Sequence, residues 1–212
     1  MTEPLAIHLR DLKRPLVDAW NREFAGIASV RVSCGDIFST KPGHIDAGDP
    51  IDVKADAVVS PANSFGFMDG GIDAVYTYQL GEGVQQRLRA LIERDFGGEL
   101  PVGTAVIVPT MNGDIPWCIS APTMRIPQDV ANTVNAYLAF RAALRAVLAH
   151  NESGPPRIRS VLCPGLGTAV GRMPVARCAR QMRSAWDRLL GGKGWVPRSV
   201  RAAADDEIAL LR

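Results

Sequence analysis

The sequence contains few of the residues that mark disulfide-rich or metal-binding proteins. It has 4 cysteines in 212 residues, far apart and without any C-x-x-C pair or Cys/His cluster: Cys34, Cys118, Cys163 and Cys178. This pattern is typical of buried thiols in a reducing compartment. The histidines also lack partners at catalytic or metal-binding spacing and are interpreted as surface or structural residues: His8, His44 and His150. We therefore expect neither a metal nor a cofactor.

An excess of charge and a long apolar run are absent as well. Lysine plus arginine number 24 against 22 aspartate plus glutamate, so the net charge of +2 gives no reason to expect nucleic acid or an anionic membrane as a partner. Charged residues interrupt the first positions, which excludes a secretion signal there, and no later run approaches about 18 uncharged apolar residues. We expect a cytoplasmic protein, and the length favours one large domain. The oligomeric state is not indicated.

Short apolar runs alternate with longer amphipathic ones along the chain. The short runs have the length of strands: residues 5–9, 29–33, 55–60, 104–108, 117–121 and 158–163. The longer runs repeat apolar residues at helical spacing and predict helices over residues 15–24, 73–92, 128–150, from 173 or 174 to 189, and 201–212. Such alternation predicts an α/β fold in which helices cover both faces of a mainly parallel central sheet.

Glycines and one turn motif refine this expectation. Gly81 and Gly83 interrupt the run after Asp73 and predict a break or bend in that helix. The runs 104–108 and 117–121 are joined by TMNGDIP, whose Asn112-Gly113 pair is a hairpin signal. We therefore expect this pair of strands to be antiparallel and the sheet to be mixed.

The stretch SPANSFGFMDGGID, residues 60–73, has the composition of a ligand loop. It follows the apolar run 55–60, so Asn63 is expected just beyond the carboxyl end of a strand, where open α/β sheets bind ligands. Gly70 and Gly71 have no Cβ, which lets backbone N–H groups approach a ligand closely.

Two further segments follow predicted strands in the same way. CPGLGTAVGRMP, residues 163–174, lies before a predicted helix, and its backbone donors and helix dipole suit a phosphate. It is neither a Walker A motif nor a dinucleotide G-x-G-x-x-G, so taken alone its glycines fit a simple chain turn equally well. Asp36, in Cys34-Gly35-Asp36-Ile37, can accept a hydrogen bond from an amino group or form an Asx turn.

In their order, these segments resemble the macro domain family, whose members bind ADP-ribose. Family members typically show a G-D-I segment, then N-A-A-N-S before a glycine-rich run and V-D, and later a proline followed by a glycine-rich loop. The matching segments are Gly35 to Ile37, Ser60 to Ser64, Gly70 to Asp73 and Pro164 to Gly171. The resemblance spans about residues 28–190. It implies one three-layer α/β/α macro-like domain over residues 1–212, with residues 1–27 as an N-terminal strand-helix extension.

The resemblance implies a ligand role for each matched residue. Asp36 would accept a hydrogen bond from the adenine amino group beside the Ile37 backbone, and Asn63 would bind the distal ribose. The pyrophosphate would lie between two sets of residues: Gly70, Gly71 and Ile72 on one side, and Gly165, Gly167, Thr168, Ala169, Val170 and Gly171 on the other. Backbone N–H donors would thus replace a basic cluster, in agreement with the near-neutral charge.

The resemblance also implies chemistry at the distal ribose. Asp73 aligns with an acidic residue that positions or activates water in hydrolytic members, with Asn63 holding the sugar and no metal needed in principle. The expected reaction is removal of ADP-ribose from modified acidic side chains of proteins or deacetylation of O-acetyl-ADP-ribose. The alternative is a non-catalytic reader of ADP-ribose or ADP-ribosylated proteins, and a third reading is a phosphatase or sensor for another nucleotide derivative. Asp73 and the Gly70-Gly71 turn favour the enzyme. Thr77, which stands where many hydrolytic members have histidine, favours the reader.

Three nearby residues have two interpretations each. Phe65 or Phe67 either covers the distal ribose as an aromatic lid or belongs to the core. Arg125 follows a predicted strand, and it either contacts an anion in the pocket or lies at the surface.

Overall fold

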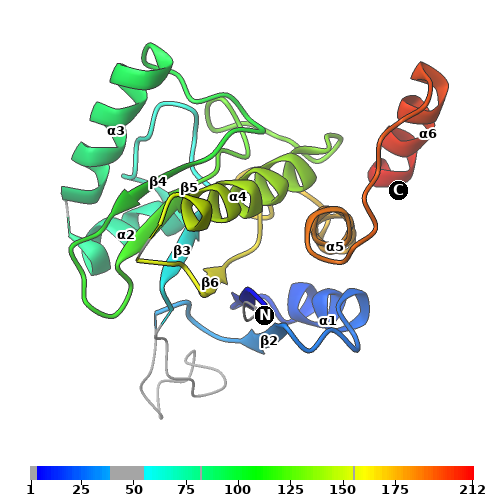
Figure 1. Cartoon of the computed structure of the whole chain (residues 1–212), viewed down its shortest axis with the longest axis horizontal. Helices are drawn as coiled ribbons and strands as arrows, with labels where there is room; N and C mark the ends of the chain where they lie inside the picture. The colour runs from blue at the N-terminus through cyan, green and yellow to red at the C-terminus, as the bar shows by residue number, and fades with distance from the viewer. Residues whose placement is uncertain (1–3, 39–54, 82, 155) are drawn as a thin grey trace.

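The computed structural model describes residues 4–38, 55–81, 83–154 and 156–212 and contains a six-stranded sheet between two layers of helices (Figure 1). In chain order the elements are β1 (Ala6–Asp11), α1 (Arg14–Glu23), β2 (Val30–Cys34), β3 (Ala57–Ser60), α2 (Gly71–Leu80), α3 (Gly83–Phe96), β4 (Val106–Pro109), β5 (Trp117–Ser120), α4 (Asn135–Glu152), β6 (Ser160–Cys163), α5 (Val175–Leu189) and α6 (Val200–Leu211). Every predicted strand and helix is present. The predicted α/β/α architecture is confirmed.

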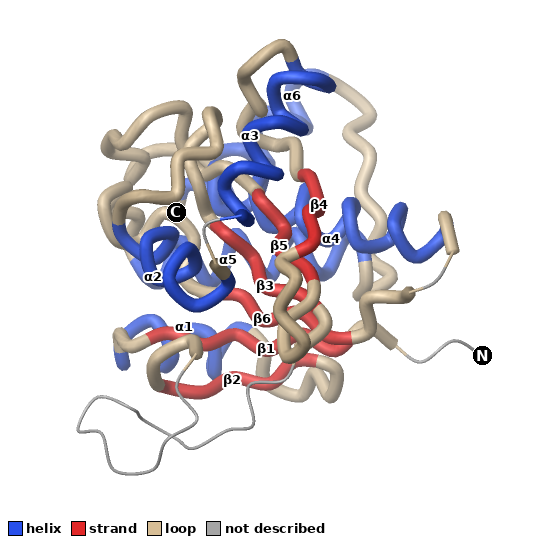
Figure 2. The backbone as a smooth tube through the Cα atoms, turned by 90° about the vertical axis from the view of Figure 1, so that its left-hand side faces the viewer, coloured by secondary structure: helices blue, strands red, loops and turns tan. Residues whose placement is uncertain are grey.

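The strands lie in the order β2-β1-β6-β3-β5-β4, which Figure 2 shows from bottom to top. All neighbouring pairs run parallel except β4 and β5, which form the predicted antiparallel hairpin. Asn112 closes the hairpin, because its Oδ1 accepts hydrogen bonds from the backbone N–H groups of Asp114 (2.8 Å) and Ile115 (3.1 Å). The carboxyl ends of the other five strands therefore meet at one edge of the sheet.

Strand β3 shows why the sheet is buried on both sides. Ala57 and Val59 belong to the core formed with α1, α4 and α5, whereas Val58 belongs to the core formed with α2 and α3. All three side chains are fully buried. A near-continuous apolar strand is expected where helices cover both faces of a parallel sheet.

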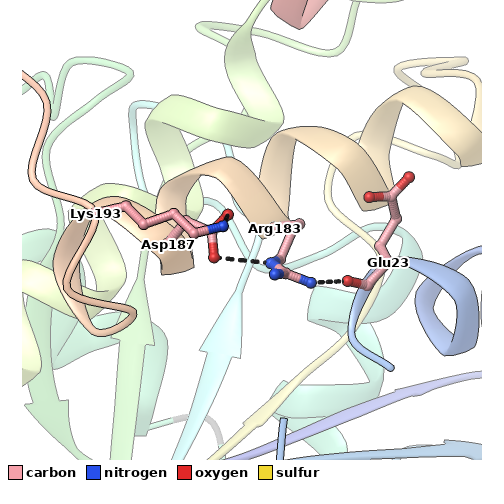
Figure 3. A network of polar contacts seen from close by, with 4 residues as sticks. All are labelled: Glu23, Arg183, Asp187 and Lys193. Carbon is pink, nitrogen blue, oxygen red and sulfur yellow. Dashed lines mark hydrogen bonds and ion pairs between the residues drawn. The ribbon is translucent and has the colours of Figure 1, made fainter. Parts of the chain in front are cut away.

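The first part of the chain supplies an internal strand and a core helix. Strand β1 pairs with β2 on one side and β6 on the other, and the buried face of α1 packs against α5. Figure 3 shows polar contacts beside this helix pair: Arg183 donates to Asp187 Oδ1 at 2.9 Å and to the carbonyl of Glu23, and Lys193 donates to Asp187 Oδ2 at 3.0 Å. These contacts link the end of α1 to α5.

Helix α4 begins later than the sequence predicts, at Asn135 rather than residue 128. The preceding residues form turns, in which Asp129 Oδ1 accepts from the Ala131 N–H (2.8 Å) and Thr133 Oγ1 donates to the Val130 carbonyl (2.8 Å). The Val130 N–H itself donates to the carbonyl of Gly171 at 2.8 Å. The assignment of Val130 to the helix was therefore wrong. Val130 is apolar because it is buried against the loop around Gly171, not because it lies on the inner face of α4. Helix α5 likewise begins at residue 175, directly after the predicted start.

Candidate functional site

A cleft of about 480 Å³ lies at the carboxyl edge of the five parallel strands. Each strand contributes residues at or near its carboxyl end: 10–13 from β1, 35–37 after β2, several residues between 61 and 73 after β3, 123 and 124 after β5, and most residues between 164 and 171 after β6. This edge is where open α/β sheets bind ligands, and the volume lies in the range of small-molecule sites. The three segments singled out from the sequence are therefore brought together.

The loop after β3 is shaped by the side chain of Asn63. Its Oδ1 accepts hydrogen bonds from the N–H groups of Phe65 (3.0 Å) and Phe67 (3.3 Å), and its Nδ2 donates to the Phe67 carbonyl at 2.8 Å. Gly66 has φ +69°, and a Cβ there would lie 2.9 Å from Ile92 of α3. The loop is thus held by Asn63 and pressed against α3. One amide N–H of Asn63 is left for a ligand.

Asp73 lies in the first turn of α2 and lines the cleft. Its side chain is buried, and Oδ1 accepts a 2.6 Å hydrogen bond from the Ser60 hydroxyl at the end of β3. Burial raises the pKa of Asp73 to about 6, the Ser60 hydrogen bond lowers it, and the nearby charge of Asp69 raises it. Above pH 6 this carboxyl group is mostly ionised, so it can accept a proton at neutral pH.

Tyr76 and Thr77 of α2 contact the sheet and the preceding loop and do not line the cleft. Tyr76 is fully buried and its hydroxyl donates to the Val59 carbonyl at 2.9 Å. Thr77 Oγ1 donates to the Met68 carbonyl at 2.7 Å. The hydroxyl of Thr77 therefore ties α2 to the loop that precedes it.

The loop after β6 presents backbone donors to the cleft. The backbone N–H groups of residues 167–171 have no acceptor among the residues that the structure describes. Gly167 has φ +69°, and a Cβ on Gly171 would lie 2.6 Å from both the Gly167 carbonyl oxygen and Val130 Cγ2. These two positions require glycine. The loop can therefore bind an anion through its main chain.

The end of β1 forms the wall of the cleft beside this loop. Asp11 Oδ2 accepts from the Gly165 N–H at 3.1 Å, and Lys13 Nζ donates to the Thr168 carbonyl at 2.7 Å. The fully buried Arg10 donates from Nε to the Asp36 carbonyl and from Nη1 to Ser33 Oγ, both at 2.8 Å. The side chains of β1 thus connect the segments after β2 and β6.

Comparison with protein families gives one match that covers more than half of the chain. The macro domain family model matches residues 59–182, from β3 to the second half of α5. The chain belongs to the macro domain family. An uncharacterized protein of Aeropyrum pernix is 37% identical over 167 residues, which cover 78% of this chain and 79% of the relative.

Solved macrodomain structures have the same fold as this macrodomain. The macrodomain of Mycobacterium tuberculosis DarG superposes with a TM-score of 0.53 at 23% identity, covering 68% of this chain and 88% of its own. An Oceanobacillus iheyensis macrodomain variant, with a glycine replaced by valine and with ADP-ribose, superposes with a TM-score of 0.52 at 17% identity, covering 74% and 86%. Structures of that protein are also known with an asparagine or an aspartate replaced by alanine.

All residues predicted for the site line the cleft of this macrodomain. They are Asp36, Ile37, Asn63, Gly70, Gly71, Ile72, Asp73, Gly165, Gly167, Thr168, Ala169, Val170 and Gly171. Their roles toward a ligand stay predictions. The Asx-turn interpretation of Asp36 is confirmed, because its Oδ1 accepts from the Phe38 N–H at 2.8 Å. The residue also lines the cleft, and its hydrogen bond to an amino group of a ligand stays a prediction.

The structure shows where Phe65, Phe67 and Arg125 lie, which bears on the two interpretations of each. Phe67 lines the cleft and is 41% exposed, with the Arg89 guanidinium 4.4 Å from its ring centre. Phe65 is half-buried beneath Arg125, whose guanidinium lies 5.0 Å from the ring centre. Arg125 is exposed and forms an ion pair with Glu99 at 2.7 Å. Of the two phenylalanines, Phe67 is thus the one placed at the cleft, and its role as a cover for the ribose stays a prediction. Arg125 lies at the surface.

Sequence reasoning missed the wall formed by β1. Arg10, Asp11 and Lys13 line the cleft because β1 is an internal strand, flanked by β2 and β6. The signal was available, since three charged residues within the four positions Arg10-Asp11-Leu12-Lys13 follow an apolar run, as Asp36 does.

The described residues contain neither a metal-binding cluster nor a membrane-spanning helix. Within the described ranges, no group of three or more His, Cys, Asp or Glu side chains is arranged to hold a metal ion. In the same ranges, no helix has the length and apolar character needed to span a bilayer. Of the histidines, His8 and His150 are half-buried, and His44 lies outside the described residues.

Proposed function

We propose that this macrodomain binds ADP-ribose in the cleft and hydrolyses a carboxylate ester carried by the distal ribose. Adenine would lie beside Asp36, the pyrophosphate between the start of α2 and the loop 165–171, and the distal ribose near Asn63 and Asp73. The observation that carries the proposal is the placement of a buried carboxyl group, with a pKa of about 6, at the wall of a cleft lined by main-chain donors. Family membership and the Oceanobacillus structure with ADP-ribose support the ligand.

The spacing of three residues supports the same assignment. In the Oceanobacillus variants the replaced glycine lies seven positions after the replaced asparagine, and the aspartate three positions after the glycine. Asn63, Gly70 and Asp73 have this spacing, and all three line the cleft. These are the residues to which we assign the ribose, the pyrophosphate and the attacking water.

Asp73 would act as the general base. The ionised carboxylate accepts a proton from a water molecule as that water attacks the carbonyl carbon of the ester. The bond between this carbon and the ribose oxygen breaks, and the proton held by Asp73 passes to the departing ribose oxygen. General base help of this kind contributes about 10² to 10⁴-fold to a rate. The same step serves two substrates, because a modified acidic side chain and O-acetyl-ADP-ribose are both carboxylate esters of the distal ribose.

The second candidate function is a reader that binds ADP-ribose without turnover. It is favoured by Thr77, which stands where many hydrolytic members have histidine and whose hydroxyl donates to the Met68 carbonyl. It is also favoured by the Ser60 hydrogen bond, which occupies one oxygen of Asp73. The two functions share the cleft and differ only in what Asp73 does.

The test compares hydrolysis by the wild type and Asp73→Asn. Each is incubated with a peptide ADP-ribosylated on glutamate and with O-acetyl-ADP-ribose, and free ADP-ribose is measured by chromatography. The asparagine retains an acceptor for Ser60 but cannot act as a base, so we expect turnover to fall by at least about 100-fold while ADP-ribose binding persists. Asp114→Asn, at the exposed hairpin tip, is the matched control and should keep the wild-type rate.

Two results would change the assignment. Tight ADP-ribose binding by the wild type with no turnover of either substrate would establish the reader. Calorimetry with ADP-ribose, ADP and AMP tests the ribose assignment, because of the three only ADP-ribose carries the distal ribose. Equal affinities would remove the role given to Asn63 and would favour a sensor for another nucleotide.

A further inference from the structure

We infer that Lys13 contacts the phosphates of the bound ligand, so that the β1–α1 turn, residues 11–13, is a ligand-binding element of this cleft. The inference rests on the proposed function for the identity of the ligand. It adds a charged contact to a site in which main-chain N–H groups were expected to bind the phosphates alone.

The β1–α1 turn is fixed against the loop that would hold the pyrophosphate. Asp11 connects the two, because its Oδ1 accepts from the Lys13 N–H at 2.9 Å and its Oδ2 accepts from the Gly165 N–H at 3.1 Å. The Lys13 side chain crosses to the same loop and donates to the Thr168 carbonyl at 2.7 Å. Its ammonium group therefore lies at the Thr168 carbonyl, within the loop whose N–H groups are assigned to the pyrophosphate.

The other charges around the cleft are mostly negative, so the Lys13 ammonium group matters for binding an anion. Among the residues that the structure describes, four carboxyl groups line the cleft: Asp11, Asp36, Asp69 and Asp73. Among the described lining residues the cations are Arg10 and Lys13. Arg10 is fully buried and its guanidinium donates to Ser33 and to the Asp36 carbonyl, whereas Lys13 is exposed. Of these two cations, Lys13 is thus the one that solvent reaches and that an incoming anion can contact.

A lysine in this position can bind a phosphate without leaving the loop. The ammonium group has three N–H donors, and the Thr168 carbonyl uses one of them. A phosphate oxygen can accept another, which offsets repulsion between the doubly charged pyrophosphate and the carboxyl groups. The contact depends on charge and is weakened by salt.

The experiment measures ligand binding to the wild type, Lys13→Gln and Arg14→Gln by calorimetry. Glutamine keeps an N–H donor for the Thr168 carbonyl and removes the charge. Arg14 is the matched control, since it is the exposed basic residue that follows Lys13 and is not among the cleft-lining residues. The ligands are ADP-ribose, ADP and adenosine, the last followed by NMR titration because it has no phosphate. Thermal unfolding checks that each variant is folded.

We expect Lys13→Gln to lose roughly 10- to 150-fold in affinity for ADP-ribose and ADP, the size of one charge-assisted hydrogen bond. Adenosine binding should not change, and Arg14→Gln should bind all three ligands like the wild type. Raising the salt from roughly 50 to 500 mM should weaken ADP-ribose binding less in Lys13→Gln than in the wild type.

Different results identify different failures. If the wild type binds ADP-ribose and Lys13→Gln binds it equally well, the inference about Lys13 is wrong and the proposed function stands. An equal loss for adenosine would mean that Lys13 only positions the loop. If the wild type does not bind ADP-ribose at all, the proposed function itself fails.

Discussion

The hydroxyl of Ser60 donates a 2.6 Å hydrogen bond to Oδ1 of Asp73, which joins the last residue of β3 to the first turn of α2. The bond stabilises the ionised carboxylate, whereas burial disfavours it, and burial has the larger effect, because the pKa of Asp73 is raised to about 6. Asp73 is therefore ionised at neutral pH at a cost in folding free energy. Such a cost is common where a buried group is kept for function.

Asp73→Asn should stabilise the fold at neutral and alkaline pH. The pKa of Asp73 is about 6 when folded and 3.8 as its ordinary value, so the folded state binds the proton more tightly. The loss of folding stability caused by ionising the buried carboxyl group is therefore absent below pH 3.8, grows between pH 3.8 and 6, and is complete above pH 6. We expect the variant to gain about 2 to 3 kcal/mol near pH 8 and less near pH 4.5, measured by urea unfolding. A variant less stable than the wild type near pH 8 would contradict this.

Ser60→Ala should raise the pKa of Asp73 further. The hydrogen bond from Ser60 lowers this pKa, so its removal leaves burial less opposed. We expect an increase of about one unit or more, since a hydrogen bond to a charged group contributes about 1.5 to 3 kcal/mol. Carbon-13 NMR of the aspartate side chains measures the shift, and a hydrolase would show the same displacement in the pH dependence of its rate.

Ser120→Ala is the matched control for this measurement. Ser120 lies beside Ser60 in the β3–β5 register and is equally buried, and its hydroxyl has no hydrogen-bond partner among the described residues. Its removal should leave the titration of Asp73 where it is. If both alanine variants shift the pKa equally, the change comes from altered packing and not from the lost hydrogen bond.

Much of this site follows from local sequence and the rule that parallel strands end together. Asp36 and Asn63 each follow an apolar run, so their meeting at one sheet edge was predictable. The Ser60–Asp73 bond was not, because it depends on how α2 packs beside β3. Lys13 also follows an apolar run, but the run alone does not show that β1 lies between β2 and β6, because strand order is not encoded in local periodicity.

His8→Gln should make the protein more resistant to mild acid. Burial lowers the pKa of His8 to about 4, helped by the charges of Arg31 and Arg10. Its Nε2 lies 2.8 Å from Ser33 Oγ, which accepts from Arg10 Nη1 and can thus donate to a neutral imidazole. As pH falls below the ordinary value of 6.5, the unfolded chain binds a proton that the folded protein refuses until about pH 4.

His8 should therefore make the wild type lose stability as the pH falls from 6.5 to 4. Asp73 has the opposite effect, because its protonation relieves the buried charge as the pH falls. Urea unfolding of the wild type and His8→Gln at about pH 7.5 and 5 separates the two, because the glutamine variant lacks the histidine term. Parallel losses of stability in both proteins would show that His8 is not responsible.

Gly171→Ala should damage both the fold and the cleft. A Cβ at this position would lie 2.6 Å from the Gly167 carbonyl oxygen and from Val130 Cγ2, and 3.0 Å from Met124. The neighbours must shift, and overpacking of this kind costs about 1 to 3 kcal/mol. The displaced loop also carries the N–H groups assigned to the pyrophosphate, so ADP-ribose affinity should fall with stability. Gly113→Ala is the control, because nothing lies within 4 Å of its Cβ position. Wild-type unfolding and binding by Gly171→Ala would mean that the loop accommodates a side chain and that its close packing does not shape the site.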